Sequence, residues 1–417
     1  MNTPRFSGSN INLVKTHNQQ AILMSLLYEG EISRAEIANR TSLSSATVTN
    51  LANELIGQGI ITELEPTILA LESKRAVGRP RRMLRLIPGA RYAIGVHIGV
   101  GLFRVAITNL HAEIVDNSIV EYTLKSPPSE VLGKIAAEID DLLTDTAIDR
   151  QRVLGVGVGA SGLVNHDTGL NVLAPRLGWK NVNIQDFLQE RLNLPVHVDN
   201  NVRAMAIGEA FFGAGRGVSV LAFVYGRIGV GAGFVVNGKV FRGSGAGAGE
   251  IGHTIMVPEG GEPCRCGKRG CLETLVTEPV LVLQAKEIAH RHPDSLLAHY
   301  LAQENGNTPV DRIFAAARDG DQFTRAMIED RNCYLGIALA NLVNILNPEM
   351  ILLGGVFAQG DDLIRPVACR VMRDTAFSGL GDDVIVQPTS FGWRAGVIGA
   401  AALALMDLFY QREEGAA

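Results

Sequence analysis

Apolar residues recur at helical spacing between residues 11 and 65. The first set marks one face of a helix: Ile22, Leu23, Leu26 and Leu27. Ser33 and Glu36, three residues apart, have the spacing of a capping box and predict the start of a second helix. A third helix, beginning near Ser44, directs a further apolar set toward the same core: Val48, Leu51, Leu55 and Ile56. Three short helices with a tight turn between the second and third predict a helix-turn-helix.

The other face of the third helix carries short polar side chains: Ser45, Thr47, Thr49 and Asn50. If this helix enters the major groove of DNA, these side chains can reach phosphates and base edges. An ordinary three-helix bundle with a solvated polar face is the alternative interpretation.

The segment that follows is strongly basic. Gly59–Thr62 starts a strand, and Lys74–Arg85 then holds six basic residues and no acidic one. A Gly-Arg-Pro turn at 78–80 separates two short β-like runs, which is typical of the wing of a winged helix. The arginines of this region suit phosphates or the minor groove: Arg79, Arg81 and Arg82. A solvated linker is the alternative, but the preceding helices favour DNA binding.

From Tyr92 the pattern becomes one of short apolar strands. Two β runs surround a glycine-rich turn within 92–108, a third strand is expected near 114–122, and a helix and a Gly/Val strand follow. A similar hairpin with a glycine-rich turn returns at 218–240. This order predicts an α/β fold with two halves, and a cleft between two such halves suits a small ligand.

The length and composition are those of a multidomain folded protein. At roughly 150 residues per domain, 417 residues should form two to four domains, and 47 % hydrophobic residues exclude disorder. We expect a winged helix-turn-helix at 1–88, a first α/β lobe at 89–198 and a second lobe at 199–387 with a metal loop at 250–273. The C-terminal helix, at about 388–417, is expected to return to the first lobe.

Charge and hydropathy narrow the class further. A net charge of −5 argues against a protein that coats nucleic acid along its whole length. Forty-six glycines among 417 residues are about 11 % of the chain, above the usual ~7 %, and indicate tight loops near ligands. Met1–Asn10 is polar, and no uninterrupted apolar run reaches 18 residues, so we expect no signal peptide and no membrane span. A cytoplasmic protein with reduced thiols is therefore expected.

Three of the five cysteines form a cluster with an upstream histidine: His253, Cys264, Cys266 and Cys271. Three thiolates and an imidazole suit tetrahedral Zn²⁺. Four protein ligands leave no position for a catalytic water, so the prediction is a structural zinc site. An accidental grouping of free thiols is the alternative, and the glycines between the cysteines favour the metal loop.

The segment Glu250–Glu273, which reads Glu-Ile-Gly-His at its start and Cys-Arg-Cys-Gly-Lys-Arg-Gly-Cys-Leu-Glu at its end, resembles the signature of the ROK family of repressors, open reading frames and sugar kinases. Further similarity lies at 174–179, 198–201, 226–233 and 353–355, so nearly the whole chain fits. The resemblance implies a two-lobed, actin-like, hexokinase-type ATPase fold with a sugar in the cleft. It also implies a homodimer or homotetramer. The N-terminal winged helix is typical of the family's repressors.

Two departures from the family's kinases bear on activity. Where the kinases carry Asp in the first hairpin, this chain has His97, and where they carry a general base it has Asn201. An amide cannot accept the sugar proton near neutral pH, although it can still hydrogen-bond a hydroxyl. We therefore expect no catalytic residue and no kinase activity, with sugar binding retained.

By the same resemblance, the sugar would contact five residues: Asn200, Asn201, Glu250, His253 and Glu273. His253 would bind zinc through one ring nitrogen and could offer the other to a hydroxyl. Arg176 and Ser161 depart from residues common in the family, Asn and Pro respectively. These two changes bear on the identity of the sugar.

The leading hypothesis is a sugar-responsive repressor of carbohydrate-utilisation genes. Its partners would be operator DNA and a sugar or sugar phosphate, which would change the spacing of the two DNA-binding heads of a dimer. Two alternatives remain open at this point. One is an active sugar kinase with an appended DNA-binding module, and the other is a repressor controlled by a protein partner from a sugar-transport system.

Overall fold

The computed structural model describes residues 11–64, 82–303 and 306–412. The N-terminal unit is a winged helix-turn-helix with a small sheet in the order β1-β3-β2. Its elements are α1 (Ile11–Glu29), β1 (Glu31–Ser33), α2 (Arg34–Thr41), α3 (Ser45–Gly57), β2 (Ile61–Leu64) and β3 (Met83–Leu86).

Caps fix where the helices of this unit begin. The hydroxyl of Ser33 accepts from the backbone N–H of Glu36, and the Glu36 carboxylate accepts from the backbone N–H of Ser33, which is the expected capping box. Ser44 caps α3 in the same position, through the backbone N–H of Thr47. The predicted apolar face is buried, with Ile22, Leu26 and Val48 fully inaccessible to solvent.

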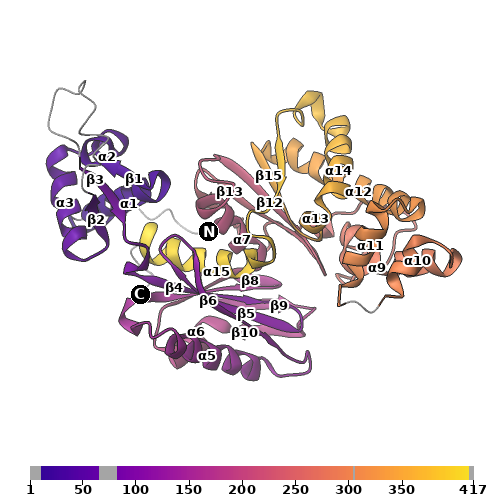
Figure 1. Cartoon of the computed structure of the whole chain (residues 1–417), viewed down its shortest axis with the longest axis horizontal. Helices are drawn as coiled ribbons and strands as arrows, with labels where there is room; N and C mark the ends of the chain where they lie inside the picture. The colour runs from indigo at the N-terminus through magenta and orange to yellow at the C-terminus, as the bar shows by residue number, and fades with distance from the viewer. Residues whose placement is uncertain (1–10, 65–81, 304–305, 413–417) are drawn as a thin grey trace.

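The first lobe contains a five-stranded sheet in the order β11-β7-β4-β5-β6. Its strands are β4 (Tyr92–Ile98), β5 (Leu102–Asn109), β6 (Ile114–Glu121), β7 (Val153–Ala160) and β11 (Val196–Asn200). Helices α5 (Pro128–Asp145) and α6 (Ile184–Leu192) cover one face, at the bottom of Figure 1. A small sheet lies beside it, formed by β8 (Leu163–Asn165), β9 (Leu170–Ala174) and β10 (Trp179–Asn183).

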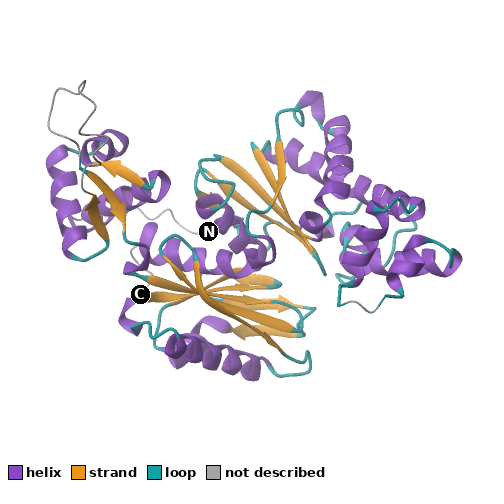
Figure 2. Ribbon diagram, viewed as in Figure 1, coloured by secondary structure: helices purple, strands orange, loops and turns teal. Residues whose placement is uncertain are grey.

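The second lobe has a sheet in the order β14-β13-β12-β15-β16. Its strands are β12 (Val220–Gly226), β13 (Val230–Val236), β14 (Lys239–Val240), β15 (Met350–Gly355) and β16 (Ile385–Pro388). Figure 2 shows helices gathered beyond its outer face. They are α8 (Glu273–Val276), α9 (Glu278–Arg291), α10 (Leu296–Leu301), α11 (Pro309–Arg318), α12 (Gln322–Leu346), α13 (Val356–Gln359) and α14 (Asp361–Thr375).

Two helices fill the space between the large sheets, α7 (Asn201–Phe212) and α15 (Ala395–Leu405). Glycines let α15 lie directly on the first sheet. A Cβ at Gly157 of β7 would stand 1.8 Å from the carbonyl oxygen of Ala400, and one at Gly95 of β4 would stand 2.1 Å from that of Val397. Any larger residue at these two positions would push the helix off the sheet.

Among the described residues, the stretch Gly392–Tyr410 is long and apolar enough to cross a membrane by length and composition alone. Its burial accounts for this composition. Every residue of α15 is buried between the two sheets, so the stretch is the central core helix of the protein.

The structure bears on the expected unit boundaries. The division between residues 198 and 199 cuts β11, which pairs with β7 along its whole length from Val196 to Asn200. We propose placing the boundary after Asn200. The C-terminal helix α15 packs on β4 and β7 of the first lobe.

The N-terminal winged helix-turn-helix, called the head below, is attached to both lobes. Arg216, in the loop between α7 and β12, donates to the carbonyl oxygens of Leu27 and Tyr28 at the end of α1, at 2.8 and 2.7 Å. One apolar core runs from the head through Ala90 and Leu110 to α7 and α15. The head is thus packed on the body rather than tethered to it by a free linker.

Candidate functional site

Three parallel strands of the first lobe end at one side of a cavity. In register, His97 of β4 lies opposite Gly159 of β7, and Asn200 of β11 lies opposite Ala160. A Cβ at Gly159 would stand 3.3 Å from the Cα of Asn201, so glycine in the neighbouring strand leaves room for the turn from β11 into α7. Ligands of open α/β sheets bind at such strand ends.

The second lobe supplies the opposite wall. The turn Arg227–Gly229 between β12 and β13 lies there, together with the segment from Glu250 to His253 and the start of α8 at Glu273. The cavity between the two walls has a volume of about 530 Å³. The structure brings all five residues of the expected sugar site to this cavity: Asn200, Asn201, Glu250, His253 and Glu273.

Asn200 has a structural role beside its place in the cavity. Its side-chain oxygen accepts from the backbone N–H groups of Val202 and Arg203 and caps α7, and its amide donates to the carbonyl oxygen of Gly162 at 2.9 Å. Only one amide proton of Asn200 is left for a ligand. Asn201, the first residue of α7, follows directly and also lines the cavity.

The carboxylate of Asp199, next to these amides, is fully buried. Arg203 donates to one of its oxygens at 2.6 Å, and Arg242 donates to the other at 2.9 Å. Both oxygens are therefore held by guanidinium groups. Asp199 is not available as a base that could replace the missing carboxylate at Asn201.

An ion pair crosses the cavity. Arg176, in the loop between β9 and β10, donates to Glu273 at 2.5 Å, and only 11 % of the Glu273 side chain is exposed. This contact joins the two lobes and uses one oxygen of a carboxylate expected to bind sugar. Burial raises the pKa of the other nearby carboxyl, Glu250.

The sequence pattern did not single out Arg104 and Arg227, which line the cavity near His97. His97 is 6 % exposed, and neither ring nitrogen has a hydrogen-bond partner in the described part of the chain. Burial lowers the pKa of His97 to about 3, with Arg104 and Arg227 acting in the same direction. The imidazole is therefore neutral at pH 7.

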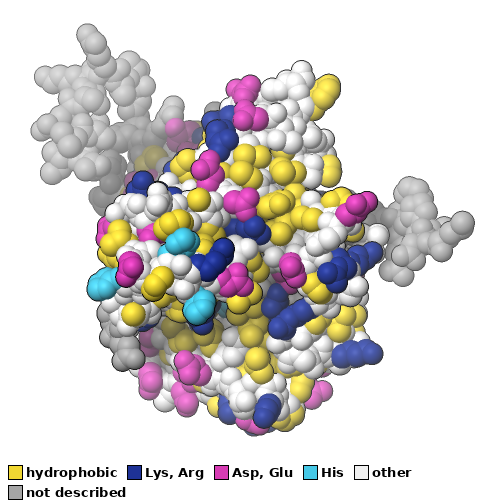
Figure 3. Space-filling view, turned by 90° about the vertical axis from the view of Figure 1, so that its right-hand side faces the viewer, with side chains coloured by type: hydrophobic (Ala, Val, Ile, Leu, Met, Phe, Trp, Pro, Cys, Tyr) yellow, Lys and Arg dark blue, Asp and Glu magenta, His cyan; other side chains and the backbone are white. Residues whose placement is uncertain are grey.

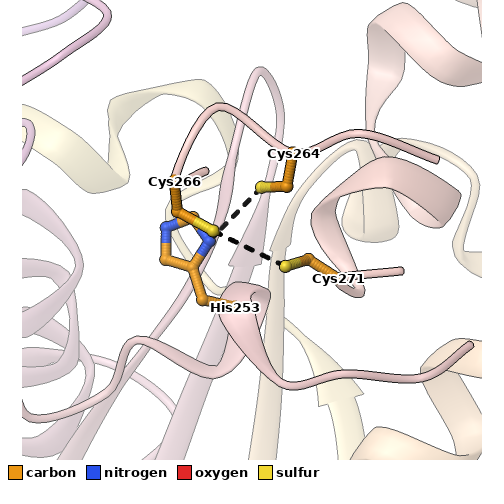
Figure 4. A group of neighbouring side chains, drawn as sticks. All are labelled: His253, Cys264, Cys266 and Cys271. Atoms are coloured by element: carbon orange, nitrogen blue, oxygen red, sulfur yellow. Dashed lines mark hydrogen bonds between the residues drawn. The ribbon is translucent and has the colours of Figure 1, made fainter. Parts of the chain in front are cut away.

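The expected metal ligands form one cluster, with the ligand atoms of His253, Cys264, Cys266 and Cys271 all within 4.8 Å of one another (Figure 4). Tetrahedral zinc with Zn–S of ~2.3 Å and Zn–N of ~2.0–2.1 Å places two sulfurs ~3.8 Å apart and a sulfur and a nitrogen ~3.6 Å apart. The Sγ atoms of Cys266 and Cys271 are 3.7 Å apart, and Cys264 Sγ is 3.6 Å from His253 Nδ1. The donor set therefore fits zinc in both chemistry and spacing.

The other nitrogen of His253 faces away from the sulfurs. Its Nε2 lies 3.9 Å from the carboxylate of Glu250. This ring orientation agrees with the expected roles of the two nitrogens, since Nδ1 lies toward the metal position and Nε2 toward the cavity residues.

In the head, Ser45, Thr49 and Asn50 are exposed and Thr47 is half-buried on α3. Thr49 donates to the carbonyl oxygen of Ser45, and the Thr47 hydroxyl contacts that of Ser44. The expected contacts Arg79 and Arg81 lie outside the described residues. Arg82 forms an ion pair with Glu63 at 2.8 Å, and it shares this carboxylate with Arg34.

Two family models match the chain. One, described as the ROK family, matches residues 93–407. The other, described as the MarR family, matches residues 15–67.

Individual relatives match over most of the chain. A xylose repressor from Caldicellulosiruptor bescii is 30 % identical over 96 % of this chain and 98 % of the repressor. A glucokinase from Halalkalibacterium halodurans is 35 % identical over 75 % of this chain and 94 % of the kinase. A solved ROK family transcriptional regulator, described as a homologue of the E. coli MLC protein, has a TM-score of 0.78 at 28 % identity, covering 94 % of this chain and 97 % of that one.

Proposed function

The chain belongs to the ROK family and is a transcriptional regulator with a MarR-like helix-turn-helix, and we propose that it is a repressor whose operator affinity changes when a sugar binds in the cavity. The observation that carries this proposal is the convergence of Asn201, Glu250 and Glu273 on one cavity between the lobes. Amide and carboxylate oxygens accept the hydrogen bonds that sugar hydroxyls donate. The target genes would be those of carbohydrate utilisation, as the name of the xylose repressor suggests.

A route from the cavity to the head supports this proposal. Helix α7 begins at Asn200 and Asn201, and runs to Phe212. Arg216 follows four residues later and binds the end of α1. A sugar that moves the start of α7 would therefore shift the contact with the head, and it would favour one of two shapes by binding that shape more tightly.

The groups for phosphoryl transfer are absent from their expected places. His97 and Asn201 cannot act as carboxylates, and Asp199 is held by two arginines. The relatives that match along the whole chain are regulators. Zinc bound by His253 and the three cysteines would act by holding Glu250 and Glu273 in place rather than by chemistry.

The DNA contacts would come from α3 in the major groove, through Ser45, Thr47, Thr49 and Asn50. The wing arginines Arg79, Arg81 and Arg82 would lie on the backbone or in the minor groove. A homodimer would present two such heads to a two-fold symmetric operator. The expected setting is the cytoplasm.

The direct test is fluorescence anisotropy with DNA fragments that the full-length protein selects in vitro, with and without xylose, glucose and other monosaccharides. We expect one sugar to change the operator Kd by about tenfold, within the usual range of allosteric coupling. Asn201→Ala and Glu250→Ala should abolish the change and keep the sugar-free Kd. Asn117→Ala, on the exposed side of β6, is the control and should behave as wild type.

The glucokinase similarity makes an active kinase the second candidate. It requires sugar-dependent ATP hydrolysis that Asn201→Ala abolishes. A lapsed kinase instead shows no turnover until His97→Asp and Asn201→Asp are combined. The sugar part of the proposal fails if no sugar changes the operator affinity and a transport-system protein binds the regulator in a pull-down without sugar.

A further inference from the structure

The chain crosses between the two lobes twice. It leaves the first lobe where β11 runs into α7 at Asn200, and it returns through residues 389–394, which connect β16 of the second lobe to α15. Helix α15 packs on the first sheet, so residues 389–394 form a direct link between the lobes. A rotation of one lobe against the other would therefore bend the chain at these two places.

A buried carboxylate near the end of α7 holds the start of this return crossing. The side chain of Glu209 is fully buried, and its Oε1 accepts from the hydroxyl of Thr389 and from the backbone N–H of Ser390, the latter at 2.7 Å. The Thr389 hydroxyl also accepts from the backbone N–H of Phe391 at 3.3 Å. The backbone N–H of Thr389 donates to the carbonyl oxygen of Leu353 in β15 at 2.8 Å. The return crossing is thus fixed to α7 on one side and to the second sheet on the other.

The same carboxylate holds the loop that carries Arg216. The Oε2 of Glu209 accepts from the backbone N–H of Ala214 at 3.0 Å, and this N–H also lies 2.9 Å from the hydroxyl of Ser390. A Cβ at Gly213 would stand 2.1 Å from the same Oε2, so glycine lets the loop pass close to the carboxylate. Two residues after Ala214, Arg216 donates to the end of α1 in the head. One carboxylate therefore joins the return crossing to the loop that contacts the head.

The stability of α7 does not explain a carboxylate at this position. Glu209 lies in the last turn of the helix, where a negative charge opposes the helix dipole. Burial adds a cost of desolvation, which the hydroxyl and the two backbone N–H donors offset. An apolar side chain would fill the same space without either cost. The contacts with the two segments are what the carboxylate adds.

We propose that Glu209 is the positioning residue that couples movement of the lobes to the head, because it makes residues 389–391 and 213–216 move together. This inference rests on the proposed sugar response and adds a second route to the one along α7. A sugar that rotates the second lobe displaces the return crossing. Through Glu209, this displacement reaches Arg216 and the end of α1.

Glu209→Gln tests the coupling with little change in side-chain size. The amide nitrogen of glutamine is a donor, so it cannot accept from the N–H and O–H groups that face it, and one of the two connections is broken. In fluorescence anisotropy, the change in operator Kd that the sugar causes should fall from about tenfold to about threefold or less. The sugar Kd, measured by isothermal titration without DNA, should stay within about twofold of wild type, because Glu209 does not line the cavity.

Asp321→Asn is the matched control. Asp321 is also a buried carboxylate, and it also accepts from two backbone N–H groups and one threonine hydroxyl, those of Leu297 and Thr324. These three residues lie at α10 and α12 of the second lobe and belong to neither crossing. The control loses a similar set of contacts, so it should lose stability in the same way and keep the full sugar response.

Hydrogen exchange measured by mass spectrometry follows the two segments directly. In wild type, the sugar should change the exchange of residues 213–216 and 389–391 together, whereas in Glu209→Gln only residues 389–391 should respond. Thr389→Val removes a single donor to the same carboxylate and should weaken the operator response in the same direction. It decides the question if Glu209→Gln does not fold.

The outcomes separate this inference from the proposed function. A full response in folded Glu209→Gln, or in Thr389→Val where Glu209→Gln does not fold, overturns the coupling role and leaves the sugar-responsive regulator intact. Equal losses in Glu209→Gln and Asp321→Asn also overturn it, because the response then follows stability alone. If no sugar changes the operator affinity of the wild-type protein, the proposed function fails and this inference fails with it.

Discussion

His97 makes the stability of the protein depend on pH. Its pKa is about 3 in the folded protein, against ~6.5 when unfolded, so below pH 6.5 the unfolded chain takes up a proton that the folded chain refuses. Stability is therefore lost as the pH falls from 6.5 toward 3, by about 2 kcal/mol at pH 5 for this residue. Burial of the imidazole is the main cause of this behaviour, and Arg104 and Arg227 act in the same direction.

Urea unfolding at pH 7 and pH 5 measures this effect in wild type and in His97→Phe. The variant should lose less stability between the two pH values, because it has no imidazole to protonate in the unfolded state. His17→Phe removes an exposed histidine and should follow wild type. Equal pH dependence in all three proteins would refute a depressed His97 pKa.

The Arg176–Glu273 pair should matter to stability because Glu273 is buried. Arg176→Ala leaves Glu273, whose side chain is only 11 % exposed, without its guanidinium partner. We expect a loss of about 3 kcal/mol in the free energy of unfolding. Arg318→Ala, which breaks the exposed pair with Asp362, should cost less than about 1 kcal/mol. Similar losses in the two variants, measured by urea unfolding, would show that burial of Glu273 does not decide the energy.

At the residue scale, the sequence predicted which residues belong to the site better than it predicted which of them interact. The four ligands of the metal cluster share a short segment, and their spacing was enough to group them. The grouping of His97 with Arg104 and Arg227 around one cavity depends on strand register and on the meeting of two lobes, which no local pattern contains. The capping role of Asn200 and the ion pair of Arg82 were also invisible in the sequence, because each depends on a partner's position in space.

Among the elements, the metal loop at 250–273 links the metal cluster to the cavity, because the residues at its two ends, Glu250 and Glu273, line the cavity. The residues of this loop have little regular secondary structure of their own, so bound zinc should hold them in place. We expect one zinc per chain by elemental analysis and a loss of sugar-dependent operator response in Cys264→Ser. Cys369→Ser, which alters a cysteine outside the cluster, should keep both properties.

A zinc content that is unchanged in Cys264→Ser would contradict the assignment of this ligand. A normal zinc content combined with a lost sugar response in Cys369→Ser would instead point to a general packing defect. These two readouts keep the metal role separate from folding.

Local signals placed the elements well wherever they were strong. The capping box at Ser33 and the cap at Ser44 positioned α2 and α3, and the glycine turns located the two hairpins. Helix α12 begins at Gln322, well before the purely apolar part of its sequence. Its first turns are only partly buried and carry charged residues. Such a mixed stretch gives a weaker periodic signal.

For the whole molecule, the contact of Arg216 with α1 should carry the sugar signal to the head. Arg216→Ala removes two hydrogen bonds to the end of α1 and a cation–π contact with Tyr28. We expect the sugar-free operator Kd to change little. The tenfold change in Kd that the sugar causes should lose about half of its coupling free energy or more. Fluorescence anisotropy with the selected operator measures both quantities.

Arg325→Ala is the matched control, because Arg325 also donates to backbone carbonyls at the end of a helix, those of Ala317 and Arg318, but far from the head. It should keep the full sugar response. An equal loss in both variants would show that the response depends on overall stability and not on this contact.

On the face shown in Figure 3, acidic, basic and hydrophobic side chains are interspersed. The family resemblance supplied the two-lobed architecture, whereas composition and periodicity alone gave only an α/β protein with two related halves. The insertion of α7 and α15 between the sheets could not be read from local pattern, because an all-apolar helix does not show which faces will cover it.

The position of α15 has a consequence for synthesis on the ribosome. Strands β4 and β7 are made long before the helix that covers them, residues 395–405. Until those residues leave the exit tunnel, the apolar face around Gly95 and Gly157 is open to water and to other nascent chains. The first lobe therefore cannot complete its core until residues 395–405 have emerged, and until then a growing chain exposes an apolar sheet surface of the kind that chaperones bind.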